Sequence, residues 1–293
     1  MKTRLTFIHA LSPLHAGTGQ GVDIIDLPIA REKATGIPFL PGSSLKGPLR
    51  DLCGDARKIK VFGPEKENAS DHAGAIVFSD QRLLLLPVRS LAGTFAWVTS
   101  PYLLQRFARD AASTSADEWP GVPAVANETQ CFIAGAESKL ALDGKVYLED
   151  LDLTVQTPAG TNADAALWAD KLAKQIFPQN ETWQSSLKAR LCIVHDDLLG
   201  FLLDTATEIT ARIRLQPNAK TVEQGGLWYE EALPTETILT GLALATPNGK
   251  TGMTDDEIFA VIAAIIEKAE QPQPLQLGGK ATVGRGLCNV RLV

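Results

Sequence analysis

Two glycine-rich segments near the start of the chain flank an acidic residue, Asp26. Residues 15–19 (HAGTG) come first, Asp26 stands in the run IDLP, and residues 41–47 (PGSSLKG) follow. Glycines let backbone amides approach a phosphate closely, and the N-terminus of a helix attracts anions. Together these segments predict a site that binds RNA phosphates and holds one carboxylate beside them.

Asp26 is the candidate catalytic residue and also the candidate metal ligand. RNA can be cut by its own 2′-hydroxyl once that group is deprotonated and held in line with the phosphorus, so one base with charge stabilisation can suffice. The carboxylate can act as the base directly, or bind a divalent metal ion whose water does so, with Mg2+ favoured by oxygen ligands. The alternative is that Asp26 only caps a turn before Pro28, and Asp23 lies close enough to compete for its role.

Basic side chains gather in the same part of the chain. Lys46 and Arg50 stand four residues apart on a predicted helix that Ser43 or Ser44 can cap. We expect these four residues and Arg31 to contact RNA. The net charge of the whole chain is −6, so phosphate binding requires a local basic cluster of this kind. A solvated helix face is the alternative interpretation of the two cations.

A further glycine-rich loop, GGKATVGRG at residues 278–286, precedes the last predicted strand. Neither this loop nor residues 248–252 satisfies the ATP-binding pattern G-x-x-x-x-G-K-[ST], and residues 17–21 lack the dinucleotide spacing G-x-G-x-x-G. An unrelated nucleotide-using enzyme is therefore disfavoured. The loop's candidate RNA-binding residues are Gly278, Gly279, Lys280, Gly284, Arg285 and Gly286.

Taken in order, these segments resemble the RAMP superfamily of CRISPR proteins. Their amino-acid sequences are most similar to those of the repeated backbone subunit of the type III-B effector complex, and the resemblance extends over most of the chain. It rests on IIDLPIARE (24–32), PFLPGSSLKGPLRD (38–51), LLLLPVRSLAGTFAWVTSP (83–101), and residues 209–215, 226–234 and 277–286.

The resemblance implies roles for the candidate site. In that family the aspartate of the IDLP loop is the cleavage residue and a divalent ion is required, and Asp26 matches that position. His15 and Glu231 are the further candidate catalytic residues, against the alternatives of a structural histidine and an ordinary strand-face carboxylate. Glu230 is the adjacent alternative to Glu231, which matches the family's E-x-L-P motif better. The implied partners are a CRISPR guide RNA, a target single-stranded RNA, further copies of the chain and other type III-B subunits.

The expected fold class is α+β, in one domain spanning residues 1–293. The resemblance implies a ferredoxin-like, RRM-related antiparallel sheet core with insertions, and a thumb hairpin at residues 212–228. Strands are predicted at 5–11, 74–80, 82–88, 191–194, 208–215, 228–231, 238–245 and 288–293, and helices at 44–52, 102–112, 165–177, 197–205 and 255–270, the last with a capping box; residues 58–73 are predicted to be a loop.

Composition narrows the remaining possibilities. The four cysteines form no C-x-x-C pair and the histidines show no metal-ligand spacing, so a structural transition-metal site is not expected. The apolar runs are too short to cross a bilayer, which predicts a cytoplasmic protein with no membrane partner. Two rival functions use the same scaffold: a non-catalytic RNA-binding subunit, and a guide-maturing ribonuclease that works alone by histidine catalysis.

Overall fold

The computed structural model describes residues 1–19, 24–54, 56–65, 72–114, 118–135, 137–156, 161–218, 221–247, 252–267 and 273–293. Asp23, the alternative to Asp26, lies outside these residues, as do residues 268–270 of the last predicted helix. No helix in the described part of the chain is both long and apolar enough to span a bilayer.

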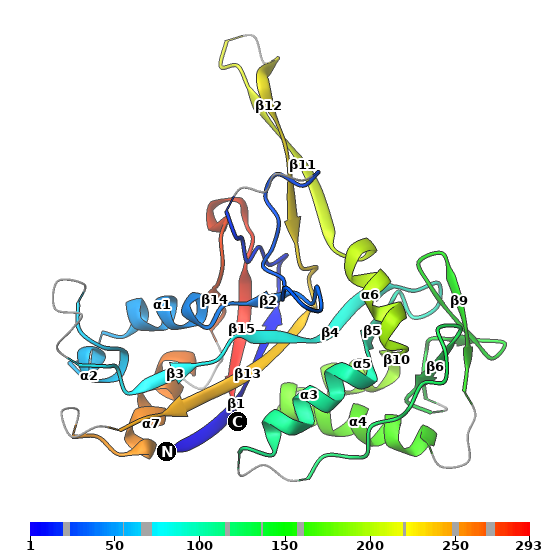
Figure 1. The fold of residues 1–293 in the computed structure, drawn as a ribbon, viewed down its shortest axis with the longest axis horizontal. Helices are drawn as coiled ribbons and strands as arrows, with labels where there is room; N and C mark the ends of the chain where they lie inside the picture. Colours follow the sequence, from blue (N-terminus) through cyan, green and yellow to red (C-terminus); the bar gives the residue numbers. More distant parts are fainter. Residues whose placement is uncertain are drawn as a thin grey trace.

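The centre of the molecule is a β-α-β-β-α-β unit, so the predicted ferredoxin-like core is confirmed (Figure 1). β3 and β4 together form its second strand, because both pair with β13. The strand order is β15-β1-β13-β4, and these pairings are antiparallel. The elements of this core are β1 (Lys2–Ala10), α1 (Gly42–Leu52), β3 (Ile76–Phe78), β4 (Gln81–Arg89), β13 (Ile238–Ala245), α7 (Asp255–Ile266) and β15 (Leu287–Leu292).

A long insertion separates β4 from β13 and continues the same sheet. Its strands include two parallel pairs, β10 with β5 and β6 with β9, so the insertion departs from the antiparallel pairing of the core. The inserted elements are β5 (Phe95–Thr99), α3 (Pro101–Ala111), β6 (Gln130–Ile133), β7 (Ala141–Leu142), β8 (Lys145–Leu148), β9 (Leu151–Val155), α4 (Thr161–Ile176), α5 (Glu181–Arg190), β10 (Leu191–Val194), α6 (Asp196–Thr205), β11 (Glu208–Leu215) and β12 (Val222–Ala232).

Two hydrophobic cores lie on the two faces of the sheet. One contains apolar side chains of α1, α7 and α6, and the other contains those of α3, α4 and α5. Alternation along β1 separates them, because Ile8 and Ala10 belong to the first core while Leu5 and Phe7 belong to the second. The ferredoxin-like helices thus cover one face, and the insertion covers part of the other.

The hairpin of β11 and β12 stands away from the body of the molecule as a two-stranded ribbon (Figure 1). Along the ribbon its two strands pair with each other, from Glu208 opposite Ala232 to Leu215 opposite Val222, and at the base Leu27 forms a parallel bridge with Glu230. Large apolar side chains along it are exposed, including Ile213 and Leu227. Unpartnered apolar side chains on a projecting ribbon indicate a surface that other molecules contact, as the predicted thumb requires.

Several predicted helix boundaries need correction. α1 begins at Gly42 with Pro41 as its N-cap, and neither Ser43 nor Ser44 caps it. The carboxylate of Asp80 instead accepts the Gly42 amide at 3.0 Å. The short helix α2 (Lys58–Phe62) forms where a loop was expected, because Val61 and Phe62 are buried in the core. The predicted capping box of α7, between Thr254 and Glu257, is confirmed.

Candidate active site and nucleic-acid interface

The loop that carries Asp26 lies parallel to the base of β12. The Leu27 amide donates to the Tyr229 carbonyl at 3.1 Å, and the Glu231 amide donates to the Leu27 carbonyl at 3.0 Å. Oδ2 of Asp26 accepts the Tyr229 amide at 2.8 Å, and the residue remains exposed. The carboxylate is therefore held at the foot of the hairpin while facing solvent, where a nucleic acid can reach it.

His15 is fixed to the same strand two residues further along. Its Nδ1 lies 2.7 Å from the Glu231 carbonyl oxygen, and the residue is buried. Because a carbonyl can only accept, Nδ1 carries a hydrogen, which leaves Nε2 as the ring nitrogen that can gain or lose a proton. Tyr229 and Glu231 are two strand residues apart, which is about 7 Å. The structure thus places both candidate catalytic side chains along one short stretch of β12.

A cleft of about 420 Å³ joins segments that are far apart in the sequence. It contains His15, Leu27 beside Asp26, Ser44 at the start of α1, and the terminal glycine loop. The segments singled out in the sequence therefore meet in space. The cleft is lined by His15, Ala16, Gly17, Gly19, Leu27, Ser44, Pro48, Gly278, Gly279 and Lys280.

The terminal glycine loop is shaped by close backbone approach to the segment before His15. The Gly279 amide donates to the His15 carbonyl at 2.9 Å, and the Gly286 amide donates to the Pro13 carbonyl at 2.8 Å. Gly278 has φ +70°, and a Cβ there would lie 2.5 Å from the His15 carbonyl oxygen. These glycines hold the wall of the cleft in place, because a side chain could not fit at this distance.

Glu230, whose neighbour Glu231 was the expected catalytic residue, is the centre of a buried charge cluster. Its carboxylate lies 2.8 Å from Lys280 Nζ, 3.3 Å from Arg212 Nε and 3.9 Å from Arg285 Nε, and it accepts Trp228 Nε1 at 2.8 Å. Burial alone would raise the pKa of Glu230, but the hydrogen bonds from Lys280 and Trp228 and the nearby cations lower it to about 2. In the sequence this residue was only the alternative to Glu231, because Glu231 matches the E-x-L-P motif better.

The charge cluster also determines where two predicted RNA-binding residues lie. Three cations surround one carboxylate, so the cluster is net positive and attracts phosphate. Lys280 is partly exposed at the cleft, whereas Arg285 is buried and donates to Thr210 Oγ1 at 3.1 Å. Lys280 is therefore the cation that is accessible to a ligand in the cleft.

The buried Glu231 and the partly exposed Arg31 form an ion pair beside the Asp26 loop. Arg31 Nη2 lies 2.6 Å from Glu231 Oε1, and Glu231 Oε2 accepts the Ile29 amide at 3.0 Å. Arg31 also donates to the carbonyls of Gly36 and Leu203, both at 2.9 Å. The structure thus gives Glu231 and Arg31 contacts that position the loop, while their predicted roles in catalysis and RNA binding stay predictions.

The basic residues of α1 are also engaged within the protein. Lys46 Nζ donates to the Ile76 carbonyl at 2.9 Å, and burial together with the nearby Arg50 charge lowers its pKa. Arg50 donates to the Pro64 carbonyl and lies 3.1 Å from Glu65. Asp80 meanwhile holds a backbone amide at the helix start, where an anion was expected to bind. Their RNA contacts stay predictions; Ser43 is exposed and Ser44 borders the cleft.

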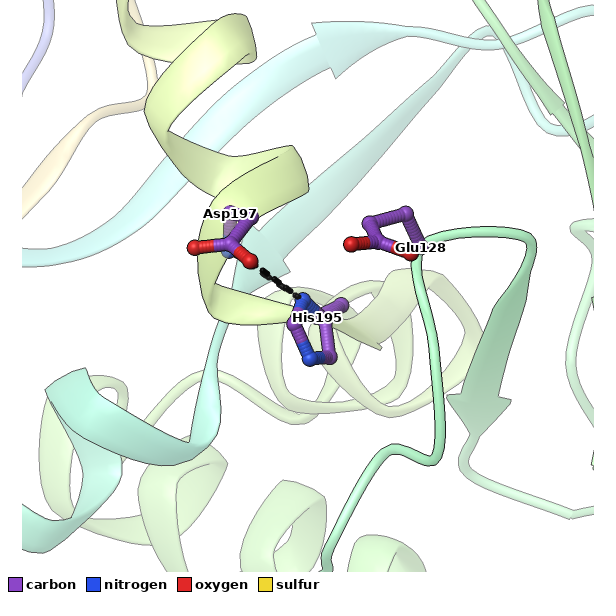
Figure 2. Close-up of side chains that lie close together, drawn as sticks. All are labelled: Glu128, His195 and Asp197. Atoms are coloured by element: carbon purple, nitrogen blue, oxygen red, sulfur yellow. Dashed lines mark hydrogen bonds and ion pairs between the residues drawn. The ribbon is translucent and has the colours of Figure 1, made fainter.

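One group of side chains has the composition of a metal site, and it does not include Asp26. One ligand atom each from Glu128, His195 and Asp197 lies within 4.8 Å of the others (Figure 2). His195 is the N-cap of α6 and its Nδ1 accepts the Asp197 amide at 3.3 Å. The positive end of a helix dipole disfavours a cation. Sequence spacing did not predict this group, because Glu128 lies more than sixty residues before His195 in the chain.

Comparison with known proteins confirms the resemblance found in the sequence. The chain matches the RAMP superfamily over residues 7–289. It is 37% identical to the CRISPR system Cmr endoribonuclease Cmr4 of Pyrococcus furiosus, covering 100% of this chain and 96% of that protein. It is 26% identical to the CRISPR system CMR subunit Cmr4 of Saccharolobus solfataricus, covering 97% and 94% of the two chains.

Solved structures agree with the sequence matches. Oligomeric Cmr4 from Pyrococcus furiosus superposes with a TM-score of 0.74 at 29% identity, covering 100% of this chain and 98% of that chain. A chain from the type III-B Cmr-beta complex bound to cognate target RNA shares the fold, with a TM-score of 0.73 at 21% identity and coverage of 100% and 97%. The chain therefore belongs to the RAMP superfamily and, within it, to the Cmr4 family.

Proposed function

We propose that this chain is a repeated backbone subunit of a type III-B CRISPR ribonucleoprotein, which binds guide RNA and cleaves guide-paired target RNA. The relative from Pyrococcus furiosus is named an endoribonuclease, and identity to it extends over the whole chain. The observation that carries the proposal is the exposed Asp26 carboxylate, fixed to the base of a projecting hairpin beside a glycine-walled cleft. The target sequence is recognised by base pairing with the guide, so the protein contacts the sugar-phosphate backbone of the RNA and recognises the shape of the duplex.

In this proposal the proton of the attacking 2′-hydroxyl passes to Asp26, or to a water that a divalent cation held by Asp26 would bind. The Asp26 carboxylate is exposed and is held by one backbone amide, so it can face a phosphodiester without rearrangement of the loop. His15 presents Nε2 in the cleft, where this nitrogen, when it carries a proton, can hydrogen-bond a phosphate or give that proton to the leaving 5′-oxygen. Lys280 supplies positive charge at the cleft, and Glu230 fixes its position.

A divalent cation, with Mg2+ as the favoured identity, is the proposed cofactor at Asp26. Mg2+ usually binds through one or two carboxylates and completes its shell with water and substrate phosphates. One exposed carboxylate fits such a shared site. When bound there, the ion would lower the pKa of a coordinated water and stabilise charge on the phosphate. The group of Glu128, His195 and Asp197 is the competing candidate for metal binding.

The projecting hairpin supports the repeated arrangement. Its large apolar side chains, such as Ile213 and Leu227, are about half exposed on a ribbon whose two strands pair with each other and which the Asp26 loop contacts at its base. We propose that they contact the duplex of guide and target RNA beside a neighbouring copy, and that other type III-B subunits complete the complex. One copy would then expose one phosphodiester to one Asp26, which predicts regularly spaced cuts.

The test is cleavage by the assembled complex. The chain is co-expressed with its partner subunits and a guide RNA, and a labelled complementary RNA is cut with Mg2+ or with a chelator present. Asp26→Ala is compared with Asp197→Ala, which removes a ligand from the competing metal group. We expect regularly spaced products that disappear with chelator and in Asp26→Ala, but persist in Asp197→Ala.

Other results would contradict the proposal in distinguishable ways. Unchanged cutting by Asp26→Ala would leave the chain as a non-catalytic scaffold. Metal-independent cutting by the isolated chain would instead favour the guide-maturing ribonuclease. Loss of cutting in Asp197→Ala alone would transfer the metal site to the start of α6.

A further inference from the structure

A second and larger cavity, of about 960 Å³, lies on the sheet face opposite α1 and α7. Its floor is the outer part of the core sheet, where Phe7 and His9 of β1 pair with Arg291 and Asn289 of β15. The turn between α4 and α5 forms the opposite wall. The cavity shares no lining residue with the cleft at His15. It is lined by Phe7, His9, Leu11, Ile176, Phe177, Pro178, Gln179, Asn180, Trp183, Glu267, Asn289, Val290 and Arg291.

One wall of the cavity is aromatic and held rigidly. The rings of Phe177 and Trp183 stack with centroids 5.5 Å apart, and His9 meets them edge-on at 5.2 and 5.6 Å. His9 is fixed in turn, because its Nε2 lies 2.5 Å from a Glu236 carboxylate oxygen. Trp183 is only partly buried, so its ring is accessible to a ligand. Such a wall binds a flat ring by stacking.

The floor of the cavity carries a cation that lacks a full set of acceptors. Arg291 Nε is buried and has no hydrogen-bond partner among the described residues. Burial lowers the pKa of Arg291, and the charge of Glu267, which also lines the cavity, opposes this effect only in part. Arg291 as a whole is only partly buried, and its enclosed Nε lacks an acceptor, which is costly for the guanidinium. An anionic ligand group in the cavity would pair with the charge of this guanidinium and offset that cost.

Three amide side chains complete the lining, and they surround the aromatic wall. Gln179 and Asn180 lie in the turn after α4, and Asn289 lies on β15. Asn180 uses its side-chain oxygen to accept the Trp183 amide at 3.1 Å, so its NH2 group points away from that bond and can donate. Amides both donate and accept, which matches the edge of a nucleobase.

We propose that this cavity is a nucleotide-binding site, in which a base stacks on Trp183 and a phosphate is bound by Arg291. The ligand chemistry is a base with a phosphomonoester, supplied either as a free nucleoside monophosphate or as the phosphorylated end of an RNA. The cavity lies on the sheet face that RRM domains use to stack bases, an analogy of fold that agrees with its chemistry. A divalent cation does not suit it, because Arg291 occupies the floor.

The test measures binding to the full chain without guide RNA, so its result is independent of the cleavage proposal. Calorimetry and tryptophan fluorescence follow titration with AMP, GMP, CMP and UMP, with adenosine and inorganic phosphate as the separate halves of the ligand. Arg291→Gln and Trp183→Phe are compared with Arg89→Gln, a matched change at an exposed arginine outside the cavity. Circular dichroism melting shows that each variant folds.

We expect saturable binding of at least one nucleoside monophosphate, weakened about tenfold or more in Arg291→Gln and unchanged in Arg89→Gln. Trp183→Phe should keep a ring for stacking and most of the affinity, while losing most of the fluorescence quenching. No saturable binding at millimolar ligand, or equal binding by wild type and Arg291→Gln, would overturn the proposal. Tighter binding of a 5′-phosphorylated trinucleotide than of the monophosphate would identify an RNA end as the ligand, and the reverse order would identify a free nucleotide.

Discussion

The Tyr229 amide donates to Oδ2 of Asp26 at 2.8 Å, which connects the acidic loop to the base of the projecting hairpin. The Leu27 amide and the Tyr229 carbonyl repeat this connection one residue further along the loop. A movement of the hairpin base therefore moves the carboxylate with it. In an assembly where the hairpin contacts a nucleic acid, this connection would couple the position of the hairpin to that of the catalytic group.

Asp26→Asn separates the charge of this residue from its structural contact. The asparagine side-chain oxygen can still accept the Tyr229 amide, so the loop should keep its place while the base and metal ligand are lost. Target cleavage by the assembled complex should fall by a factor of about 100 or more. Target binding, measured by gel shift, should stay within about twofold of wild type. Cleavage near the wild-type rate would show that Asp26 is only a turn residue.

The role of His15 can be tested with two substitutions, His15→Asn and His15→Gln, whose side-chain amides each replace one ring nitrogen. His15→Asn can still donate to the Glu231 carbonyl from the Nδ1 side but has nothing at Nε2, so it should fold normally and cut about 100-fold more slowly. His15→Gln places its amide nearer the Nε2 position and leaves the buried carbonyl without its donor, which costs about 1–3 kcal/mol of unfolding free energy. Urea unfolding and single-turnover cleavage measure the two effects, and wild-type cutting by His15→Asn would contradict the role of Nε2.

The sequence predicted the ferredoxin-like core well, because its strands alternate and its helices carry local signals such as the capping box at Thr254. It missed β5, α5 and the strands β6 to β9, and it shortened β12, because those elements are stabilised by packing within the insertion more than by local pattern. Ser43 and Ser44 satisfied the rules for an N-cap, yet Asp80, distant in the sequence, took that role. A contact between residues this far apart in the chain cannot be recognised from the local sequence around Gly42.

The sequence predicted which segments form the site, but not which of their side chains contact one another. The segments around His15, Asp26, Ser44 and Gly278 were identified from glycines and a lone acid, and the fold brings them to one cleft. Which of two adjacent glutamates contacts the cations could not be decided, because alternation assigns them to opposite faces of a strand without saying which face is occupied. The structure assigns the cations of the terminal loop to Glu230.

Two glycines of the terminal loop allow a matched test of how closely the loop backbone approaches its neighbours. Gly284 and Gly286 have φ values of +80° and +78°, so alanine is strained at both, by about 1–2 kcal/mol. A Cβ at position 284 meets open space, whereas at position 286 it would lie 2.0 Å from the Leu277 carbonyl oxygen. Gly286→Ala should therefore lower the melting temperature clearly more than Gly284→Ala, and it should also reduce RNA binding by displacing the cleft wall. Equal melting temperatures would contradict the close approach of residue 286 to the Leu277 carbonyl.

Glu230 should make the stability of the protein depend on acid pH. A folded-state pKa of about 2, against an ordinary value of 4.5, corresponds to about 3 kcal/mol of stabilisation by the carboxylate form. Since the pKa is depressed on folding, this contribution is fully present above about pH 4.5 and is lost as the pH falls toward 2. Glu230→Gln should therefore unfold in less urea than wild type at pH 7, and the gap between them should narrow below pH 4.5. The exposed Glu118→Gln should show no comparable gap. A gap that is constant between pH 7 and pH 3 would mean that the loss reflects packing alone and not the charge that holds Lys280 at the cleft.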